Sequence, residues 1–162
     1  CKCYGVEIDK TICDITKKIL KSKNKKNFDI KVGHNRSIPI KSKSVDLIIS
    51  NVLHYEDSKI NIINSLIEYR RVLKKNSYLF VTTTGNKHDF FKKTKKIKKN
   101  IYLCMNKKDT IRYKKKFFFF EKEKYLKFLL GKYFKNIETG QVTEKFSNNV
   151  FDVFIGFGVK WK

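Results

Sequence analysis

The sequence has few of the residues that break a chain or cross-link it. Proline occurs once and glycine seven times among 162 residues, which excludes a collagen-like repeat or a proline-rich linker. The four cysteines include no Cys-x-x-Cys pair, which argues against a zinc ribbon and predicts reduced thiols in a cytoplasmic setting. No apolar run approaches the roughly 18 residues of a membrane span. We therefore expect a single globular domain over residues 1–162.

Acidic residues are also scarce. Fifteen Asp and Glu stand against 38 Lys and Arg, a formal net charge of +23, and only four of the basic residues are arginine. Proteins that read nucleic acids favour arginine for its planar fork. Residues 87–116 hold twelve lysines and one arginine against two acids. We interpret residues 85–116 as a basic insertion, a helix and a loop, and a nucleic-acid contact through Lys87–Lys116 stays open beside a merely solvated face.

Hydrophobic periodicity predicts alternating strands and helices. Apolar runs at residues 3–8, 28–32, 45–49 and 78–81 indicate strands. Asp9 is placed to cap a helix whose apolar positions include Ile12 and Ile19, and a longer helix is expected between Ile60 and Leu73. Strands that alternate with helices favour a parallel α/β sheet with right-handed crossovers.

The C-terminal third has its own pattern. Residues 117–120 are four consecutive phenylalanines, expected to form a buried strand or pocket wall, with a membrane-surface anchor as the alternative. A helix is expected from Glu121. Residues 136–142 and the strictly alternating residues 151–159 predict two strands. Joined by a loop of about eight residues, they should form an antiparallel pair at one sheet edge.

In open parallel α/β sheets, ligands bind outside the carboxyl ends of the strands. Polar residues follow the expected strands at 7–9, 33–35, 50–51 and 82–84. A carboxylate such as Glu7 can accept hydrogen bonds from both hydroxyl groups of a ribose. Helix capping or solvation is the alternative. Nicotinamide-dependent dehydrogenases and methyltransferases both bind a ribose through a carboxylate at this position. Glu7 alone therefore does not distinguish between these two classes.

Four segments in order resemble class I S-adenosylmethionine-dependent methyltransferases. They are residues 5–9 (GVEID), 32–40 (VGHNRSIPI), 45–50 (VDLIIS) and 68–74 (EYRRVLK). The resemblance implies an open, mostly parallel Rossmann-like sheet with helices on both faces and an antiparallel C-terminal strand pair. It also implies S-adenosylmethionine as the cofactor.

The same resemblance implies roles for individual residues. Glu7 would hold the cofactor ribose, and Ile8 would lie against the adenine ring. His34 and Asn35, in the bend after the second expected strand, would border the edge of the adenine ring. Ser50 and Asn51, at the end of the third expected strand, would approach the methionine part of the cofactor. Arg71 would be structural. The cofactor-binding residues implied in this way are Glu7, Ile8, His34, Asn35, Ser50 and Asn51.

The chain departs from the family pattern at its start. His34 stands where many members have Asp, and Asn35 is the expected replacement acceptor. The family's first strand and glycine-rich loop are absent before Gly5, so we expect an N-terminally truncated domain that lacks half the cofactor site, with a fragment that is inactive alone as one alternative. That strand would lie between the strands ending at Ile8 and Ser50. Direct pairing of those two strands is the alternative.

The acceptor cannot be named from these residues, and we expect a small molecule. His54, just past a strand exit, is the best-placed candidate base, with a packing histidine as the alternative. Two other classes stay open. A non-enzymatic basic module would bind RNA or DNA through phosphates. A nicotinamide-dependent oxidoreductase is disfavoured by the turn at residues 71–73 and the alternating last strand.

Overall fold

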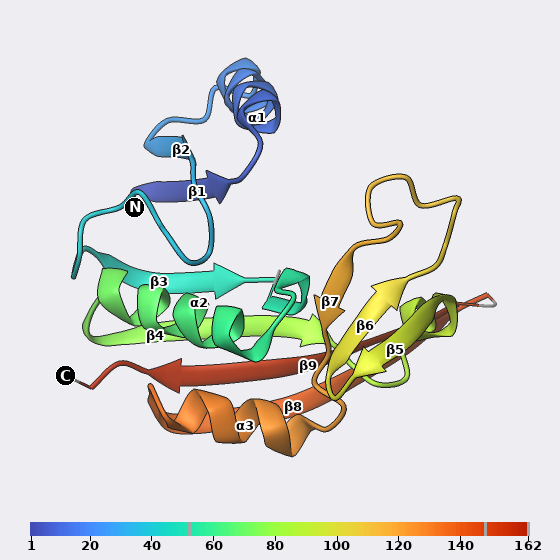
Figure 1. The fold of residues 1–162 in the computed structure, drawn as a ribbon. Coiled ribbons are helices and arrows are strands. Elements are labelled where there is room, and N and C mark those ends of the chain that lie inside the picture. The colour runs from blue at the N-terminus through green and yellow to red at the C-terminus, as the bar shows by residue number, and fades with distance from the viewer. Residues whose placement is uncertain (52, 148, 162) are drawn as a thin grey trace.

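The computed structural model describes residues 1–51, 53–147 and 149–161 (Figure 1). Its helices and strands, in chain order, are β1 (Cys3–Glu7), α1 (Lys10–Ser22), β2 (Phe28–Val32), β3 (Val45–Ser50), the 3-10 helix η1 (Leu53–Tyr55), α2 (Lys59–Val72), β4 (Leu73–Thr84), the 3-10 helix η2 (Asp89–Lys93), β5 (Thr94–Lys98), β6 (Ile101–Cys104), β7 (Lys116–Phe118), α3 (Glu123–Gly131), β8 (Lys135–Phe146) and β9 (Asn149–Val159).

The strands form three sheets. β1 and β2 pair in parallel, and β3 pairs in parallel with β4 at the start of a four-stranded sheet of order β3-β4-β9-β8. β9 runs antiparallel to both β4 and β8. The third sheet has the order β5-β6-β7. Parallel strands followed by an antiparallel C-terminal pair confirm the expected α/β class.

Local chemistry explains where the elements begin and turn. The Asp9 carboxylate accepts hydrogen bonds from the backbone N–H groups of Thr11 at 2.6 Å and Ile12 at 3.2 Å, so α1 starts at the expected cap. Ser58 caps α2 through the N–H of Asn61 at 3.3 Å. Asn76 has a φ of 59°, the left-handed conformation that asparagine tolerates, and it bends the chain within β4.

One hydrophobic core joins α2 and α3 to the same face of the four-stranded sheet (Figure 1). Gly156 on β9 lets α3 approach closely, since a Cβ there would lie 2.6 Å from Leu130 Cδ1. The four phenylalanines are buried, as expected, with exposures of 0–2%. Phe118 and Phe120 join this core, while Phe117 and Phe119 join a second cluster beside β6.

The unit formed by β1, α1 and β2 stands apart from the main sheet. In Figure 1 the arrows of β1 and β3 point to the same end, and the described ladders include none between them. Direct pairing of these strands, the alternative above, is therefore not formed. The two strands leave apolar side chains 37–64% exposed, among them Val6 and Ile49. Unpaired apolar edges attract further strands. The expectation of an additional strand between them stays a prediction.

Two expectations for the second half are wrong in detail. Residues 85–116 do not form a helix and a loop, because they contain η2 and most of a three-stranded antiparallel sheet. β7 completes this sheet, and its phenylalanines are distant in sequence from β5. The lysine-rich sequence around β5 therefore gave no indication of a sheet. The expected eight-residue loop is also wrong, since Phe146 already pairs with Asn149.

Candidate functional site

The first part of the site lies where β1 and β2 end. The strands are parallel with Glu7 opposite Val32, and the N–H of Gly33 donates to the Glu7 carbonyl at 2.9 Å. Glu7 and the bend that contains His34 and Asn35 therefore lie at the same sheet end, which confirms their expected convergence. Glu7 Oε1 accepts a hydrogen bond from the N–H of Ile8 at 2.7 Å, which orients the carboxylate.

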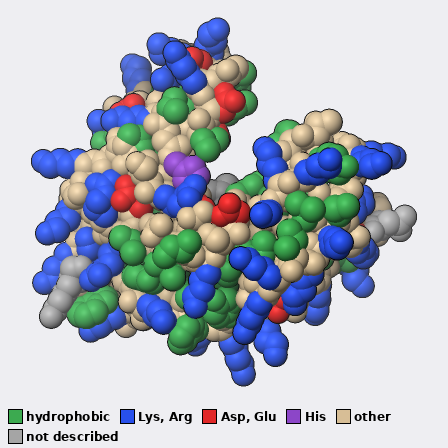
Figure 2. Space-filling model, viewed as in Figure 1, with side chains coloured by type: hydrophobic (Ala, Val, Ile, Leu, Met, Phe, Trp, Pro, Cys, Tyr) green, Lys and Arg blue, Asp and Glu red, His purple; other side chains and the backbone are tan. Residues whose placement is uncertain are grey.

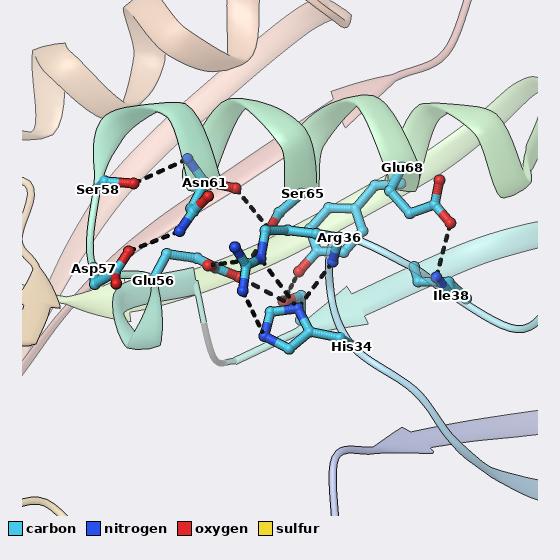
Figure 3. Close-up of polar contacts among 11 residues, drawn as sticks. His34, Arg36, Ile38, Glu56, Asp57, Ser58, Asn61, Ser65 and Glu68 are labelled. Carbon is cyan, nitrogen blue, oxygen red and sulfur yellow. Dashed lines mark hydrogen bonds and ion pairs between the residues drawn. The ribbon is translucent and has the colours of Figure 1, made fainter. Parts of the chain in front are cut away.

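His34 is held by a pair of charged residues that the sequence analysis did not single out (Figure 3). The backbone N–H and Nε–H of Arg36 approach His34 Nδ1 at 3.2 and 3.3 Å. Arg36 Nε also lies 3.4 Å from Glu56 Oε2, and Glu56 is only 3% exposed. The Ser65 hydroxyl donates to Glu56 Oε1 at 3.0 Å. No local pattern distinguishes Glu56 from a solvated acid, because its burial depends on packing between α2 and the bend.

The loop that carries this bend is fastened to α2 by Arg71. Its Nε and Nη2 donate to both carboxylate oxygens of Glu68, at 2.8 and 2.7 Å. Its guanidinium also donates to the carbonyls of Ile38 at 2.8 Å and Ile40 at 3.0 Å. Glu68 in turn accepts from the N–H of Ile38 at 2.7 Å (Figure 3). Arg71 therefore has a structural role, as the resemblance implied, because it holds the loop of residues 38–40 against α2.

At the end of β3 the two expected site residues differ. The Ser50 hydroxyl is buried and lies 2.8 Å from the hydroxyl of Tyr69 on α2, so it faces the core. Asn51 is exposed, and its Oδ1 accepts from the Thr82 hydroxyl at 3.1 Å. The structure thus presents the Asn51 side chain at this edge, whereas Ser50 can contribute only backbone groups there.

The second part of the site is a cavity of about 560 Å³ beside Asn51. It lies at the carboxyl ends of β3 and β4, where Thr82, Thr83 and Thr84 enter its lining. Other walls come from η1, the η2 region, β7 and β9. The remaining lining residues are Ile49, His54, Phe80, His88, Phe90, Arg112, Phe117, Phe151 and Val153. His54 is therefore brought to a cavity, as expected of a candidate base, and Phe117 is a wall residue.

Two residues of the cavity lining, His54 and Thr83, each have a buried polar atom without a partner among the described residues. Within the described part of the chain, His54 Nδ1 and Thr83 Oγ1 have no hydrogen-bond partner. Burial, with smaller contributions from the nearby His88 and Arg112, lowers the pKa of His54 from 6.5 to about 4. Burial also lowers the pKa of His88. Both imidazoles are therefore neutral at pH 7, and the lowered pKa makes His54 a weaker base than an exposed imidazole.

The depressed pKa of His54 predicts that stability falls with acid. Between pH 6.5 and about 4 the unfolded chain binds a proton at His54 that the folded chain does not, so the free energy of unfolding should decrease by about 2 kcal/mol across this range. Urea unfolding at pH 7, 5.5 and 4.5 measures this slope. His54→Phe should flatten it, with a residual slope of the same sign from His88 and, toward the acid end, from Glu68 and Asp152, whose pKa values are also lowered; an unchanged slope would contradict the assignment.

Together these features define a class of protein. Polar groups at the carboxyl ends of parallel strands, beside a cavity, are the arrangement in which open α/β sheets bind nucleotide-like cofactors and their substrates. The family model described as "Methyltransferase domain" matches residues 1–81, half of the chain. The chain belongs to this family.

Solved structures agree on the fold. An S-adenosylmethionine-dependent methyltransferase from Methanosarcina mazei matches with a TM-score of 0.73 and 18% identity, over 98% of this chain and 81% of that one. A similar enzyme from Thermotoga maritima matches with a TM-score of 0.66 and 20% identity, over 96% and 72%. The N-methyltransferase NodS from Bradyrhizobium japonicum, solved with S-adenosyl-L-homocysteine, matches with a TM-score of 0.62 and 9% identity, over 99% and 67%. No curated protein matches the chain.

Proposed function

We propose that this methyltransferase-family chain uses S-adenosylmethionine to methylate a small molecule held in the cavity. One observation carries the proposal: Glu7, the His34–Asn35 bend and the cavity beside Asn51 lie at the carboxyl ends of parallel strands. A nucleoside at the first two and a methyl acceptor in the cavity would share one edge of the fold (Figure 1). Family membership supports methyl transfer, and the S-adenosyl-L-homocysteine in NodS supports the cofactor.

The residues at the β1–β2 end fit a nucleoside. Glu7 offers a carboxylate fixed by a backbone N–H, the group that a ribose diol requires. Ile8 is 66% exposed, which leaves an apolar side chain beside that carboxylate for the adenine ring. Asn35 lies half-buried in the neighbouring bend, where its amide can meet the adenine edge. His34 is oriented by Arg36, so it would border the ring from a fixed position.

The β3 end fits the reacting half of the cofactor. There the Asn51 amide and the backbone of Ser50 would position the methionine part. The bound cofactor supplies a methyl group that is already electrophilic. The protein then needs mainly to align the acceptor and exclude water. The apolar cavity walls exclude water, and His54, although a weak base, is the candidate in the lining for taking up the proton that an oxygen or nitrogen acceptor loses.

A small acceptor agrees better with the structure than a nucleic acid. All twelve lysines of residues 87–116 are exposed, and none lines the cavity. Figure 2 shows Lys and Arg scattered over the visible face without gathering in one patch. Nothing beyond net charge favours the nucleic-acid module. Among the described helices none is long and apolar enough to cross a membrane. The single-domain boundary and the cytoplasmic setting stay predictions.

Replacing Glu7 tests the proposed cofactor site. Glu7→Gln keeps an oxygen that accepts from the N–H of Ile8 but removes the charge that strengthens the bonds to the ribose. We expect S-adenosyl-L-homocysteine to bind about 10- to 30-fold more weakly by isothermal titration. Glu144→Gln, the same change at an exposed position of β8, is the control and should bind as wild type does. Equal affinities for all three proteins would overturn the proposed site.

A further inference from the structure

The floor of the cavity is one face of the main sheet. Ile49 lies opposite Phe80 in the β3–β4 ladder, and Thr84 lies opposite Val153 in the β4–β9 ladder. Side chains directly opposite each other on paired strands project from the same face. This face is open, because α2 and α3 pack on the other one (Figure 1). Ile49, for example, is 64% exposed, so the floor offers an apolar surface to a ligand.

One wall of the cavity carries a positively charged group. Arg112 is the only lysine, arginine or acid among the described lining residues. Its Nε lies 2.5 Å from Asp109 Oδ2, and its guanidinium lies over the Phe90 ring, 5.1 Å from the centroid. The two terminal Nη groups bond to no described residue, and the side chain is 40% exposed. Arg112 is therefore held in place through Nε and its planar face, while its Nη edge stays available.

A second hydrogen-bond donor adjoins the same phenylalanine. His88 Nδ1 accepts the backbone N–H of Phe90 at 3.1 Å. Since the neutral imidazole carries a single N–H, that hydrogen is on Nε2. His88 Nε2 bonds to no described residue, and it is not one of the enclosed unpaired atoms. Its N–H is therefore accessible, unlike His54 Nδ1.

The electrostatic surroundings favour an anion beside these two donors. Burial lowers the pKa of His88 most, and the Arg112 charge contributes, so the guanidinium acts on this imidazole across a short distance. Asp109 offsets part of the Arg112 charge, but residues 87–116 hold thirteen basic residues against two acids. A positive field attracts anionic ligands to a cleft. An ammonium ligand would find no carboxylate in the described lining to replace its hydration.

We propose that the cavity binds a small apolar carboxylic acid, with its apolar body on the sheet face and its carboxylate at Arg112 and His88. The volume of about 560 Å³ lies within the range of small-molecule sites. Arginine suits this role because its planar fork donates two parallel hydrogen bonds to a carboxylate. The identification of the acid as the methyl acceptor rests on the proposed function. The binding claim does not, because it depends only on the lining.

Three matched probes test the selectivity without cofactor. 2-Naphthoate carries the carboxylate, 2-naphthamide is its uncharged counterpart of the same shape, and 2-naphthylmethylammonium carries a positive charge. In calorimetric titrations 2-naphthoate should bind about tenfold more tightly than 2-naphthamide, and the ammonium ion more weakly still. In ¹H–¹⁵N spectra 2-naphthoate should shift the amides of residues 88–90 and 112. If 2-naphthamide binds as tightly as 2-naphthoate, or if no probe binds, the proposal is overturned.

Arg112→Gln tests the main contact. It should reduce the preference for 2-naphthoate over 2-naphthamide from about tenfold to about twofold. The affinity for 2-naphthamide should not change, which shows that the cavity is intact. Lys107→Gln removes the same charge from an exposed position outside the lining and should keep the tenfold preference. A preference that survives Arg112→Gln, or that Lys107→Gln abolishes equally, would contradict the proposed site.

His88→Asn tests the second donor. His88 caps η2 through its contact with Phe90, and asparagine can make the same capping bond, so the variant keeps the local fold but loses the Nε2–H. The preference for 2-naphthoate should fall to about threefold. An unchanged preference would show that His88 does not contact the carboxylate.

The two proposals fail separately. If 2-naphthoate binds with an Arg112-dependent preference but S-adenosyl-L-homocysteine binds no protein in the series, the cavity assignment stands and the proposed function falls. If S-adenosyl-L-homocysteine binds in a Glu7-dependent way but 2-naphthoate has no advantage over 2-naphthamide, the proposed function stands and this inference falls.

Discussion

Asp152→Ala should lower the free energy of unfolding by about 4 kcal/mol, the largest effect that we expect from a single substitution. Asp152 lies on β9 and is fully buried. Its carboxylate accepts hydrogen bonds from the Thr143 hydroxyl at 2.6 Å, the Gln141 amide at 2.8 Å and the backbone N–H of Lys87 at 2.8 Å. Burial alone would raise the pKa of Asp152, but these bonds outweigh it and hold the pKa below its ordinary value.

The effect should extend to the cavity. Asp152 joins β8 and β9 to the segment after β4, which leads to His88 and Phe90 on the cavity wall. Alanine leaves two side-chain donors and one backbone donor without their acceptor. Urea unfolding measures the loss, and amide hydrogen exchange should show faster exchange over residues 85–91. A loss below 1 kcal/mol would show that the Asp152 carboxylate does not hold β8 and β9 to the segment after β4.

A double-mutant cycle with Gly85 isolates the contact. A Cβ at Gly85 would lie 2.2 Å from Asp152 Oδ2, so Gly85→Ala alone should be destabilising. With Asp152→Ala present, that clash is removed, and the second substitution should cost much less than it does in wild type. A coupling of about 1 kcal/mol or more is expected. Strict additivity of the two losses would contradict the close approach.

Arg71→Met should lower the free energy of unfolding by about 3 kcal/mol. Methionine retains much of the apolar stem but leaves Glu68, whose side chain is 14% exposed, without its ion-pair partner. It also frees the carbonyls of Ile38 and Ile40. The hydrogen bonds from Arg71 lower the pKa of Glu68 despite burial, so this part of the stability should be present at pH 7 and be lost as acid protonates Glu68.

Arg71→Lys is the matched control for this substitution. Lysine keeps the charge but cannot make the forked pair to Glu68 together with two carbonyl contacts, so it should recover only part of the loss. Both variants should loosen the loop that carries His34, which hydrogen exchange at residues 34–38 would report. If Arg71→Lys is as stable as wild type, a single charge interaction with Glu68 is sufficient, and the forked geometry of the guanidinium does not contribute to stability.

Local signals account for the parts of the fold that were predicted correctly. The Asp9 cap and the alternation along residues 151–159 depend on neighbours in the chain, and each lies where the sequence indicated. The convergence of Glu7 with the bend at residues 33–35 follows from one rule, that parallel strands end at the same side of a sheet. It required no knowledge of side-chain contacts.

Contacts between distant segments account for what was missed. β5 was expected to be helix or loop because lysines dominate it, and the short β6 was expected to belong to the same segment; their strand character depends on β5 pairing with β6 and β6 pairing with β7. The hydroxyl of Ser50 was placed at the site by its position at a strand end, but Tyr69 draws it into the core. Arg36 and Glu56 carried no sequence signal, since their importance arises from burial and pairing that only the folded chain creates.

Chemical-shift mapping with S-adenosyl-L-homocysteine tests the central claim most directly. In ¹H–¹⁵N spectra of the chain, the account predicts that the ligand shifts the amides of Ile8, residues 33–35 and Asn51, and that Glu7→Gln raises the concentration at which these shifts occur. Shifts confined to residues 87–116, or the absence of any ligand-dependent shift at the ends of β1, β2 and β3, would contradict it.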